Sequence, residues 1–285
     1  MSNTLSTSLI LDTLSKRTQT IIGNQLAPVG FFASDFSEDE LNQGQAVQVP
    51  IATAGGTAQT NPTNWESGDS TIGNRPVVVS GYSVSFHLTP LQTNNSFRLA
   101  QLMDINVQNF VHAVSDAATA VFTGTHWTNF IEAAATFSAT NLKTIRAGIA
   151  RSPQRNILLD PTYYANFLPA SLSTEIGPKA GLSGFDAFAE VTRWSGAGTN
   201  VVGFAGGPQC VGYVSGLPRL DSNLKTAINA TVTNVNIGGG KILPVMLSTW
   251  TSLATRLQWA SLDVMFGAGR LDNTKGYLIK SGGSA

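Results

Sequence analysis

Charged residues are scarce in this chain. Only 12% of its 285 residues are charged, about half of the quarter that is usual in soluble proteins. The 17 basic and 17 acidic residues cancel, so no net field draws the chain to nucleic acid or to an anionic membrane. Because the cores of protein interfaces are depleted in charge, we expect much of the surface to face other subunits. An ordinary protein rich in Ser, Thr, Asn and Gly would have the same composition, so both interpretations stay open.

Cysteine and long apolar runs are also rare or absent. Cys210 is the only cysteine, which excludes an intrachain disulfide and is consistent with a reducing compartment. We expect its thiol to be buried and inert. No stretch approaches the roughly 18 consecutive apolar residues of a membrane helix, and Met1 to Leu14 lacks the basic start and apolar run of a signal peptide. We therefore expect a soluble protein that is made in the cytoplasm.

The motifs of common enzyme classes are missing. There is no Walker loop and no Gly-x-Ser-x-Gly elbow, and residues 196–198 lack the third glycine of a dinucleotide loop, so they predict a turn. His112 and Asp116 lie four apart and are more simply a pair on one helix face than a catalytic dyad. No metal-ligand spacing relates the three histidines, His87, His112 and His126. We expect no catalytic site, no cofactor and no metal.

A long polar segment with two arms occupies residues 46–88. Val47, Val49 and Ile51 alternate with polar residues, which predicts a strand. Val77 to Leu88 predicts a second strand, and its change of phase near Gly81 predicts a bulge. Residues 53–76 between the arms have too few apolar side chains to pack on their own, and such loops are uncommon in compact domains. We expect this segment to find its buried surface on a neighbouring subunit.

Trp65 is the main candidate for that contact. A tryptophan in a polar, glycine-rich arm has little intramolecular core to join, and tryptophan is favoured as an interface anchor. The alternative is that the arm folds back and Trp65 packs on its own domain. Glu66, Asp69 and Arg75 could add ion pairs to a neighbouring subunit, each of little energy if exposed.

The strongest helix pattern in the chain follows the second arm. It predicts a helix of about 28 residues from Asn95 to Thr123, roughly 42 Å long, which Gly124 would stop. The apolar stripe consists of Leu99, Met103, Phe110, Val114, Ala117 and Val121, widened by Leu102, Ile105 and Ala118. By contrast, residues 2–30 predict only a weak helical face.

The rest of the chain alternates helices and strands. Residues 142–150 predict a short helix, residues 156–159 a buried strand, and Asp160 with Pro161 the N-cap and first turn of another helix. The part after residue 237 predicts mainly strands, with residues 267–269 as a turn between the last two.

The order of these parts resembles the major capsid protein fold of tailed phages, the Hong Kong 97 type, which encapsulin shells share. The segments Asn156 to Pro161 and Gly212 to Pro218 are similar to steps in the axial domain of that α+β fold. The resemblance implies an N-terminal arm at 1–45, an E-loop at 46–88, a P-domain with its spine helix at 89–138, an A-domain at 139–236, and closing strands with a C-terminal tail at 237–285.

The resemblance also implies a function. The chain would be a structural protein that assembles through pentamers and hexamers into an icosahedral virion capsid. Its partners would be further copies, a separate scaffolding protein, a portal, a decoration protein, and packaged DNA bound weakly and without sequence preference. Residues 46–88 contain no lysine, so the lysine–asparagine cross-link of some family members cannot start from this arm.

Two other functions stay open at this point. One is an encapsulin-like compartment shell with a protein cargo, which a cargo-peptide groove on the inner face would distinguish. The other is an enzyme or a carbohydrate-binding β-protein that uses the polar segment as a substrate loop. Monomeric behaviour together with a clustered acidic or histidine pocket would favour that last function.

Overall fold

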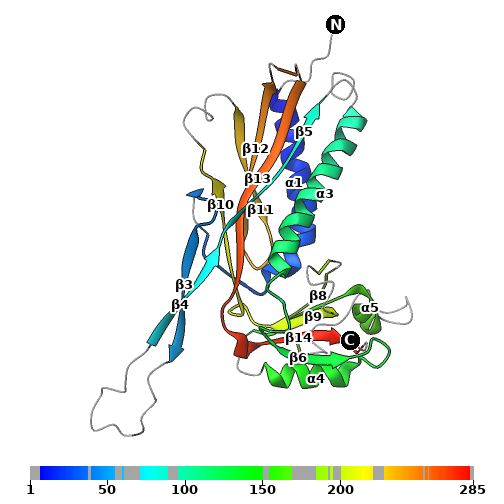
Figure 1. Ribbon diagram of the computed structural model, residues 1–285. Helices are drawn as coiled ribbons and strands as arrows, with labels where there is room; N and C mark the ends of the chain where they lie inside the picture. The colour runs from blue at the N-terminus through cyan, green and yellow to red at the C-terminus, as the bar shows by residue number, and fades with distance from the viewer. Residues whose placement is uncertain are drawn as a thin grey trace.

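The computed structural model is an elongated α+β molecule with two halves and a projecting hairpin (Figure 1). It describes residues 7–37, 40–54, 60, 71–88, 96–149, 154–168, 184–191, 193–194, 200–220, 228–252, 254–255 and 257–282. The large-sheet half contains two long helices and a seven-stranded sheet, and the small-sheet half contains a five-stranded sheet with short helices. Within the described helices, none is both long and apolar enough to cross a membrane.

The large sheet runs in the order β1-β10-β13-β12-β11, with β2 beside β10 and β5 beside β13. Its strands are β1 (Ala33–Asp35), β2 (Glu40–Leu41), β5 (Ser80–Leu88), β10 (Val211–Pro218), β11 (Asn229–Asn236), β12 (Ile242–Ser252) and β13 (Leu257–Arg270). Helices α1 (Thr7–Gly30) and α3 (Ser96–Thr119) pack against each other; α1 also packs on β11 and β12, and α3 on β5 and β13. The main core therefore lies between the helix pair and one face of this sheet.

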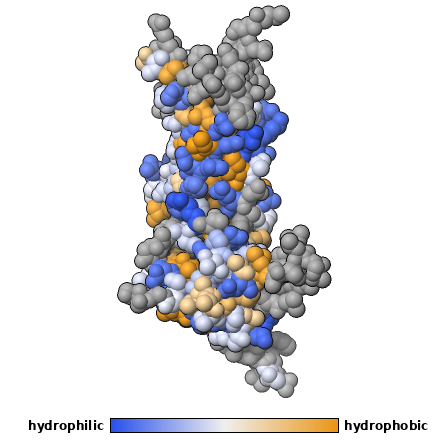
Figure 2. Space-filling model, turned by 90° about the vertical axis from the view of Figure 1, so that its right-hand side faces the viewer, coloured by the Kyte–Doolittle hydropathy of each residue, from blue (hydrophilic) through white to orange (hydrophobic). Residues whose placement is uncertain are grey.

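The predicted long helix is confirmed in outline as α3, but it ends at Thr119 rather than near Gly124. Its stripe is buried at Leu99, Met103, Phe110 and Val114. Ile105, which we expected to widen the stripe, is 58% exposed because it lies on the other side of the helix. Figure 2 shows this side of the molecule as a mosaic of hydrophilic and hydrophobic residues.

Helix α1 is much more regular than its sequence predicts. It has 24 residues, and Ile10, Leu14, Ile22 and Leu26 are buried in the same core as α3. The N-terminal segment is therefore a core element of the large-sheet half over residues 7–30.

The small sheet runs in the order β6-β14-β9-β7-β8. Its elements are β6 (Thr128–Glu132), α4 (Ala139–Gly148), β7 (Asn156–Leu159), α5 (Pro161–Tyr164), a 3-10 turn (Ala165–Phe167), β8 (Ala187–Glu190), β9 (Val201–Gly206), a 3-10 turn (Asn273–Lys275) and β14 (Gly276–Ser281). The predicted strand 156–159 is confirmed as β7. The predicted cap is confirmed too, since the Asp160 side chain accepts a hydrogen bond from the Thr162 N–H at 2.9 Å.

The bulge predicted near Gly81 is wrong. β5 pairs with β13 in unbroken register from Ser80↔Phe266 to Leu88↔Gln258. The phase changes because the chain changes partner at Val79: the strand before it pairs with β3 (Ala46–Ala54), whereas β5 joins the large sheet. The outward extension therefore involves residues up to 78, and residues 80–88 belong to the body.

Candidate functional site

The hairpin of β3 and β4 (Thr71–Val78) is the most distinctive surface feature of the molecule. The two strands pair antiparallel from Ala46↔Val78 to Ala54↔Thr71, with a register shift near Ala52. Figure 1 shows this ribbon leaving the large-sheet half and pointing away from both halves. Because directly opposite residues of an antiparallel pair lie on the same face, the register divides the ribbon into two faces.

The inner face is anchored on the chain's own body. Val49 and Val77 are buried, and Val47 and Ile51 pack against the same cluster. That cluster is formed with Leu41, Val79, Val214, Met265 and Leu271. Burying each such side chain contributes on the order of 1.5–3 kcal/mol, so the root of the hairpin has a fixed direction.

Two glycines of β13 allow the root to lie this close. A Cβ atom added at Gly267 would lie 2.5 Å from the Val78 carbonyl oxygen, and one at Gly269 would lie 2.7 Å from Val77 Cγ2. The turn predicted at residues 267–269 is therefore wrong: β13 continues through them to Arg270. These glycines leave room for β4 to lie close to β13. Close approach of another backbone is a common reason for glycine inside a strand.

The outer face of the ribbon carries no charged side chain at its described positions. Ile72 is 70% exposed and Val78 is 58% exposed. The face alternates these with small, cyclic or amide side chains, namely Ala46, Gln48, Pro50, Asn74 and Pro76. Ile72 and Val78 are therefore two separate exposed apolar side chains on this face, near the two ends of β4.

The free edges of the ribbon are interrupted by proline. Pro50 on β3 and Pro76 on β4 have no N–H, so each must occupy a position whose N–H would point away from the partner strand. A third strand would miss a backbone donor at that place on either side. Pairing with a further strand is therefore disfavoured at these two positions.

Of the four residues predicted to contact a neighbour, the structure describes one. Arg75 is exposed on β4, opposite Val49. Trp65, Glu66 and Asp69 lie outside the described residues, and the inter-subunit role of all four stays a prediction. Sequence reasoning missed Val78, because the exposed or buried state of a strand residue depends on which partner covers it.

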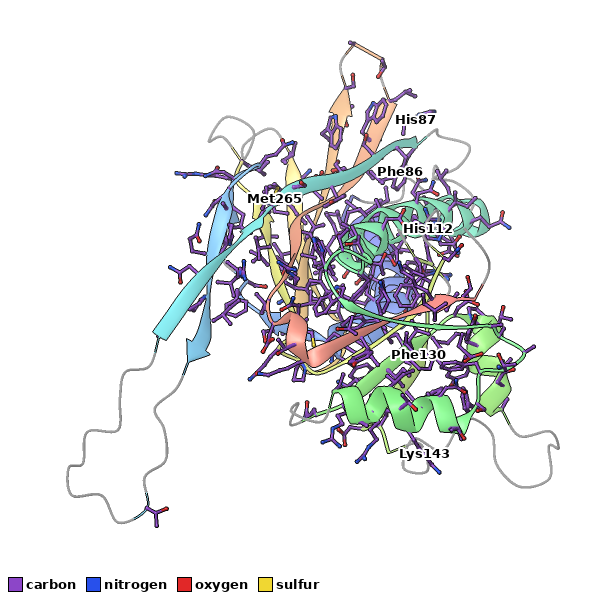
Figure 3. All side chains as sticks on the ribbon, turned by 60° about the horizontal axis from the view of Figure 1, so that its bottom comes forward. Phe86, His87, His112, Phe130, Lys143 and Met265 are labelled. Carbon is purple, nitrogen blue, oxygen red and sulfur yellow. The ribbon has the colours of Figure 1, made fainter. Side chains whose placement is uncertain are left out.

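The histidines and acidic residues do not assemble a reactive group in the described part of the chain. His87 lies on β5 with its ring 5.6 Å from the ring of Trp259, whereas His112 lies on α3 (Figure 3). Asp116 is bonded to Arg193, which donates from Nε and Nη2 at 2.6 Å each, rather than to His112. No group of three or more His, Cys, Asp and Glu residues there could hold a metal ion.

Cys210 is buried, as predicted. Burial raises the pKa of its thiol to about 12, although a backbone hydrogen bond from Gly207 acts in the opposite direction. A thiol with this pKa is almost never ionised near neutral pH, so it is a poor nucleophile.

Comparison with solved structures identifies the fold. The chain is similar to the virus-like particle from Pyrococcus furiosus, with a TM-score of 0.56 at 8% identity over 94% of this chain and 98% of that chain. It is also similar to the capsid of an empty GTA particle (TM-score 0.54, 12% identity, 90% of this chain and 97% of that chain) and to Gordonia phage Cozz (0.53, 11%, 90% and 87%). This chain has the major capsid protein fold of tailed phages. No protein-family model and no curated protein matches the sequence.

Proposed function

We propose that this chain is the major capsid protein of a tailed phage, a shell subunit that assembles into an icosahedral head around DNA. In this proposal the β3–β4 hairpin is the E-loop, α3 is the spine helix of the P-domain, and the small-sheet half belongs to the A-domain. The single observation that carries the proposal is the outer face of the hairpin, which exposes Ile72 and Val78 and has no charged side chain among its described residues.

The hairpin supplies both direction and energy for assembly. Its inner face is buried on its own body, so the outer face is free to contact a second copy. Burying Ile72 and Val78 on that copy would contribute on the order of 1.5–3 kcal/mol for each side chain. A shell repeats this contact once per subunit, and head-to-tail contacts of this kind close into rings when the rotation allows. Modest contacts then sum to a stable particle.

The other partners follow from the same proposal. Trp65, Glu66, Asp69 and Arg75 would extend the inter-subunit contact beyond the outer face. Pentamers and hexamers would form the shell, with a separate scaffolding protein, a portal and a decoration protein as further partners. Because the net charge is zero, we expect packaged DNA to be held weakly and without sequence preference. The subunit would be made in the host bacterial cytoplasm and end in the virion.

An encapsulin-like compartment shell is the second candidate, and the likeness to the Pyrococcus furiosus virus-like particle favours it. The two functions differ in what the particle holds. Particles purified after expression with the neighbouring genes would contain DNA if the chain is a phage capsid protein, and a protein cargo if it is a compartment shell.

The direct test is negative-stain microscopy of the expressed chain, alone and with a candidate scaffold. We expect closed shells of uniform size. The double variant Ile72→Asp/Val78→Asp should stay folded, with an unchanged thermal midpoint, but form no shells, because each carboxylate would be desolvated in the interface. The matched variant Ile72→Leu/Val78→Ile keeps the face apolar and should still assemble.

Deletion of residues 55–73 provides a second test of the hairpin. The deleted chain should remain a soluble, folded subunit that builds no stable shells. Normal shells from this deletion, or from the double aspartate variant, would contradict the proposed role of the hairpin. Small discrete particles under every condition would contradict the shell function itself.

A further inference from the structure

The large sheet has a second face, opposite helices α1 and α3 (Figure 1). On β5, β12 and β13, residues such as Phe86, Leu247 and Ala260 belong to the core beneath the helices. Side chains alternate along a strand, so the residues between them point to the other side of the sheet. The register aligns these outward residues in rows that cross the three strands. Two neighbouring rows differ in their chemistry.

The first row is aromatic. Trp250 of β12 lies opposite Trp259 of β13, which lies opposite His87 of β5. The planes of the two indole rings are inclined by only 10°, with centroids 6.2 Å apart, and the His87 ring lies 5.6 Å from that of Trp259. Both tryptophans are partly exposed, and His87 is exposed. The row is therefore an apolar platform that reaches solvent.

The next row consists of Ser248, Ser261 and Ser85. Ser261 donates to the Asp263 carboxylate at 2.6 Å, so Ser248 is the donor in the 2.7 Å contact between the Ser248 and Ser261 hydroxyls. Ser248 and Ser261 are buried, whereas Asp263 is partly exposed and Ser85 is exposed. Two buried hydroxyl groups thus orient a carboxylate that solvent reaches, and this carboxylate has only acceptor atoms to offer.

An aromatic platform beside oriented acceptors suits a carbohydrate. A pyranose ring presents C–H groups, which are slightly positive, on its faces, and these pack on the negative face of an aromatic ring. Its hydroxyl groups lie around the edge and donate to carboxylate and hydroxyl oxygens. Trp259 and Asp263 are four residues apart on one strand, which is roughly 13 Å. This span is longer than one sugar ring, so the fitting ligand is an oligosaccharide.

The hairpin of a second copy fits this face less well. The outer face of the hairpin has no charged side chain at its described positions, so covering Asp263 with it would desolvate the carboxylate without supplying a charged partner, which is costly. The hydroxyl groups of a sugar would keep the carboxylate hydrogen-bonded. Asp263 would repel an acidic glycan, so the charge of the face favours a neutral one.

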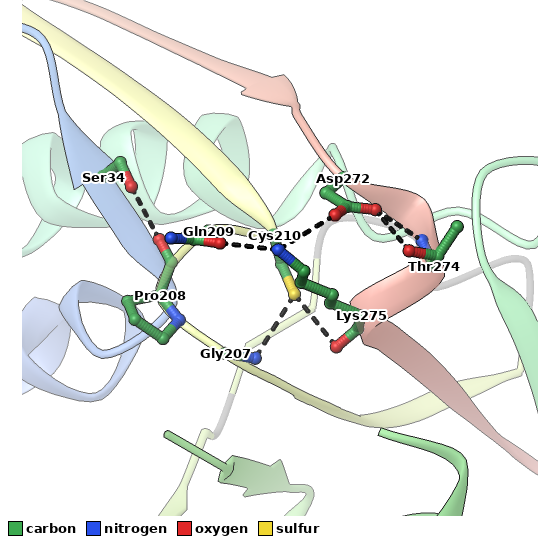
Figure 4. Close-up of polar contacts among 8 residues, drawn as sticks. All are labelled: Ser34, Gly207, Pro208, Gln209, Cys210, Asp272, Thr274 and Lys275. Carbon is green, nitrogen blue, oxygen red and sulfur yellow. Dashed lines mark hydrogen bonds and ion pairs between the residues drawn. The ribbon is translucent and has the colours of Figure 1, made fainter. Parts of the chain in front are cut away.

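The polar side chains around Lys275 provide a contrast (Figure 4). The Lys275 ammonium donates to Gln209 Oε1 at 2.6 Å and lies 3.2 Å from the Asp272 carboxylate. Asp272 also accepts hydrogen bonds from the backbone and hydroxyl of Thr274. Donors and acceptors in this group are directed at one another. The group therefore stabilises the turn between β13 and β14 and has less to offer a ligand than Asp263.

We propose that the outward face of β5, β12 and β13 binds a neutral oligosaccharide between Trp250 and Asp263. Trp250 and Trp259 stack on the C–H face of one sugar, and Asp263 accepts hydrogen bonds from the hydroxyl groups of another. Such sites, with aromatic walls and a few placed polar groups, are typical of small-molecule recognition. The free chain suffices for binding, so the proposal goes beyond the shell function and does not depend on it.

Saturation-transfer NMR of the soluble full chain tests the proposal directly. The probes are maltohexaose, cellohexaose and chitohexaose, each up to about 10 mM, a range that detects weak binding. We expect at least one of them to bind, with the strongest transfer to the ring C–H protons. If none of the three binds, the proposal is overturned.

Variants locate the site on the sheet. Trp259→Ala should weaken binding about tenfold, because a stacking surface is lost, whereas Trp259→Phe keeps an aromatic ring and should retain most of the affinity. Asp263→Asn should weaken binding several-fold, because an amide is a poorer acceptor than a carboxylate. Ile105→Ala removes an exposed apolar side chain on the helix side and is the control, with unchanged affinity. The thermal midpoint of each variant shows whether it is folded.

Two results with these variants would contradict the site. One is equal affinity in Trp259→Ala and Ile105→Ala. The other is a loss of binding in Trp65→Ala but not in Trp259→Ala, which would place the sugar on the segment between β3 and β4.

The unmodified chain decides if Trp259→Ala does not fold. The indole N–H signals of Trp250 and Trp259, assigned with Trp→Phe variants, should shift when the bound sugar is added, while that of the buried Trp194 should not. Sugar binding without a shift of either outward tryptophan would overturn the proposal. Because these measurements need no assembled particle, the sugar site and the shell function can fail separately.

Discussion

Glycine 267 shows how one small residue positions a whole surface. The absence of a side chain there allows the backbone of Val78 to lie against β13, and this contact helps to aim the hairpin. Its role is steric rather than conformational, so sequence reasoning that treats glycine as a turn former misplaced it. The residues Gly267-Ala268-Gly269 are consistent with a turn and also with a strand against which another strand packs closely. The sequence alone could not distinguish the two.

Gly267→Ala should therefore lower stability by about 1–3 kcal/mol, the usual cost of overpacking, because the new methyl group would meet a backbone oxygen. Gly81→Ala is the control: its Cβ would lie 3.3 Å from the flexible thioether sulfur of Met265, which can move aside. Urea unfolding of both variants measures the difference. If the Gly267 variant were as stable as the Gly81 variant, the backbone of β4 would not lie in close contact with β13 at this position.

Asp272, which caps the 3-10 turn at Asn273–Lys275, makes the stability of the protein depend on pH. Burial acts to raise its pKa, but hydrogen bonds from Thr274 and Lys275 outweigh burial and hold the pKa below its ordinary value of 3.8. A carboxyl group with a lowered folded-state pKa adds stability at pH above its ordinary value, and this is lost as the pH falls through the folded-state pKa. We expect the thermal midpoint of the unmodified protein to decrease when the pH is lowered below about 4. The decrease should be smaller in Asp272→Asn. Parallel curves for both proteins would exclude this contribution.

At the scale of elements, helix α1 is part of the structural core. Its side chains at 10, 14 and 22 are fully buried against α3 and the large sheet. The sequence pattern was weak because this helix also carries polar residues such as Thr18 in its buried stripe. The periodicity of a sequence shows only how apolar one face of a helix is. Whether a weakly apolar face is buried depends on the elements that pack against it, here α3 and the large sheet.

Leu14→Ala should cost about 2–5 kcal/mol, since it leaves a cavity in a packed core. Ile105→Ala, on the exposed side of α3, should change stability by less than about 0.5 kcal/mol. Chemical denaturation of the two variants gives the comparison. A neutral Leu14 variant would mean that α1 is a detachable arm.

The sequence predicted elements well where the signal is local, and poorly where it depends on a distant partner. The strand at 156–159, the Asp160 cap and most of the long helix could be predicted because the residues that form them are neighbours in the chain. The division between β4 and β5 could not, because it depends on pairing with residues 17–32 positions away in β3 and 170–186 positions away in β13. The candidate contact surface was predicted as a segment, but its exposed face at Ile72 and Val78 required the register.

For the whole molecule, the scarcity of charge has a consequence for assembly. If subunits meet through uncharged faces such as that of the hairpin, salt has little to screen. The yield of shells should therefore change little between low and high sodium chloride, as measured by light scattering and microscopy. A steep loss of particles with added salt would indicate that ion pairs, such as those proposed for Glu66, Asp69 and Arg75, dominate the contact.

The two prolines of the hairpin have a further consequence for the free chain. The hairpin is a long ribbon with open edges, and such edges ordinarily recruit strands from other chains into fibrils. Pro50 and Pro76 break the row of donors on each side. We therefore expect free copies of this chain to resist edge-to-edge pairing through the hairpin, even at high concentration.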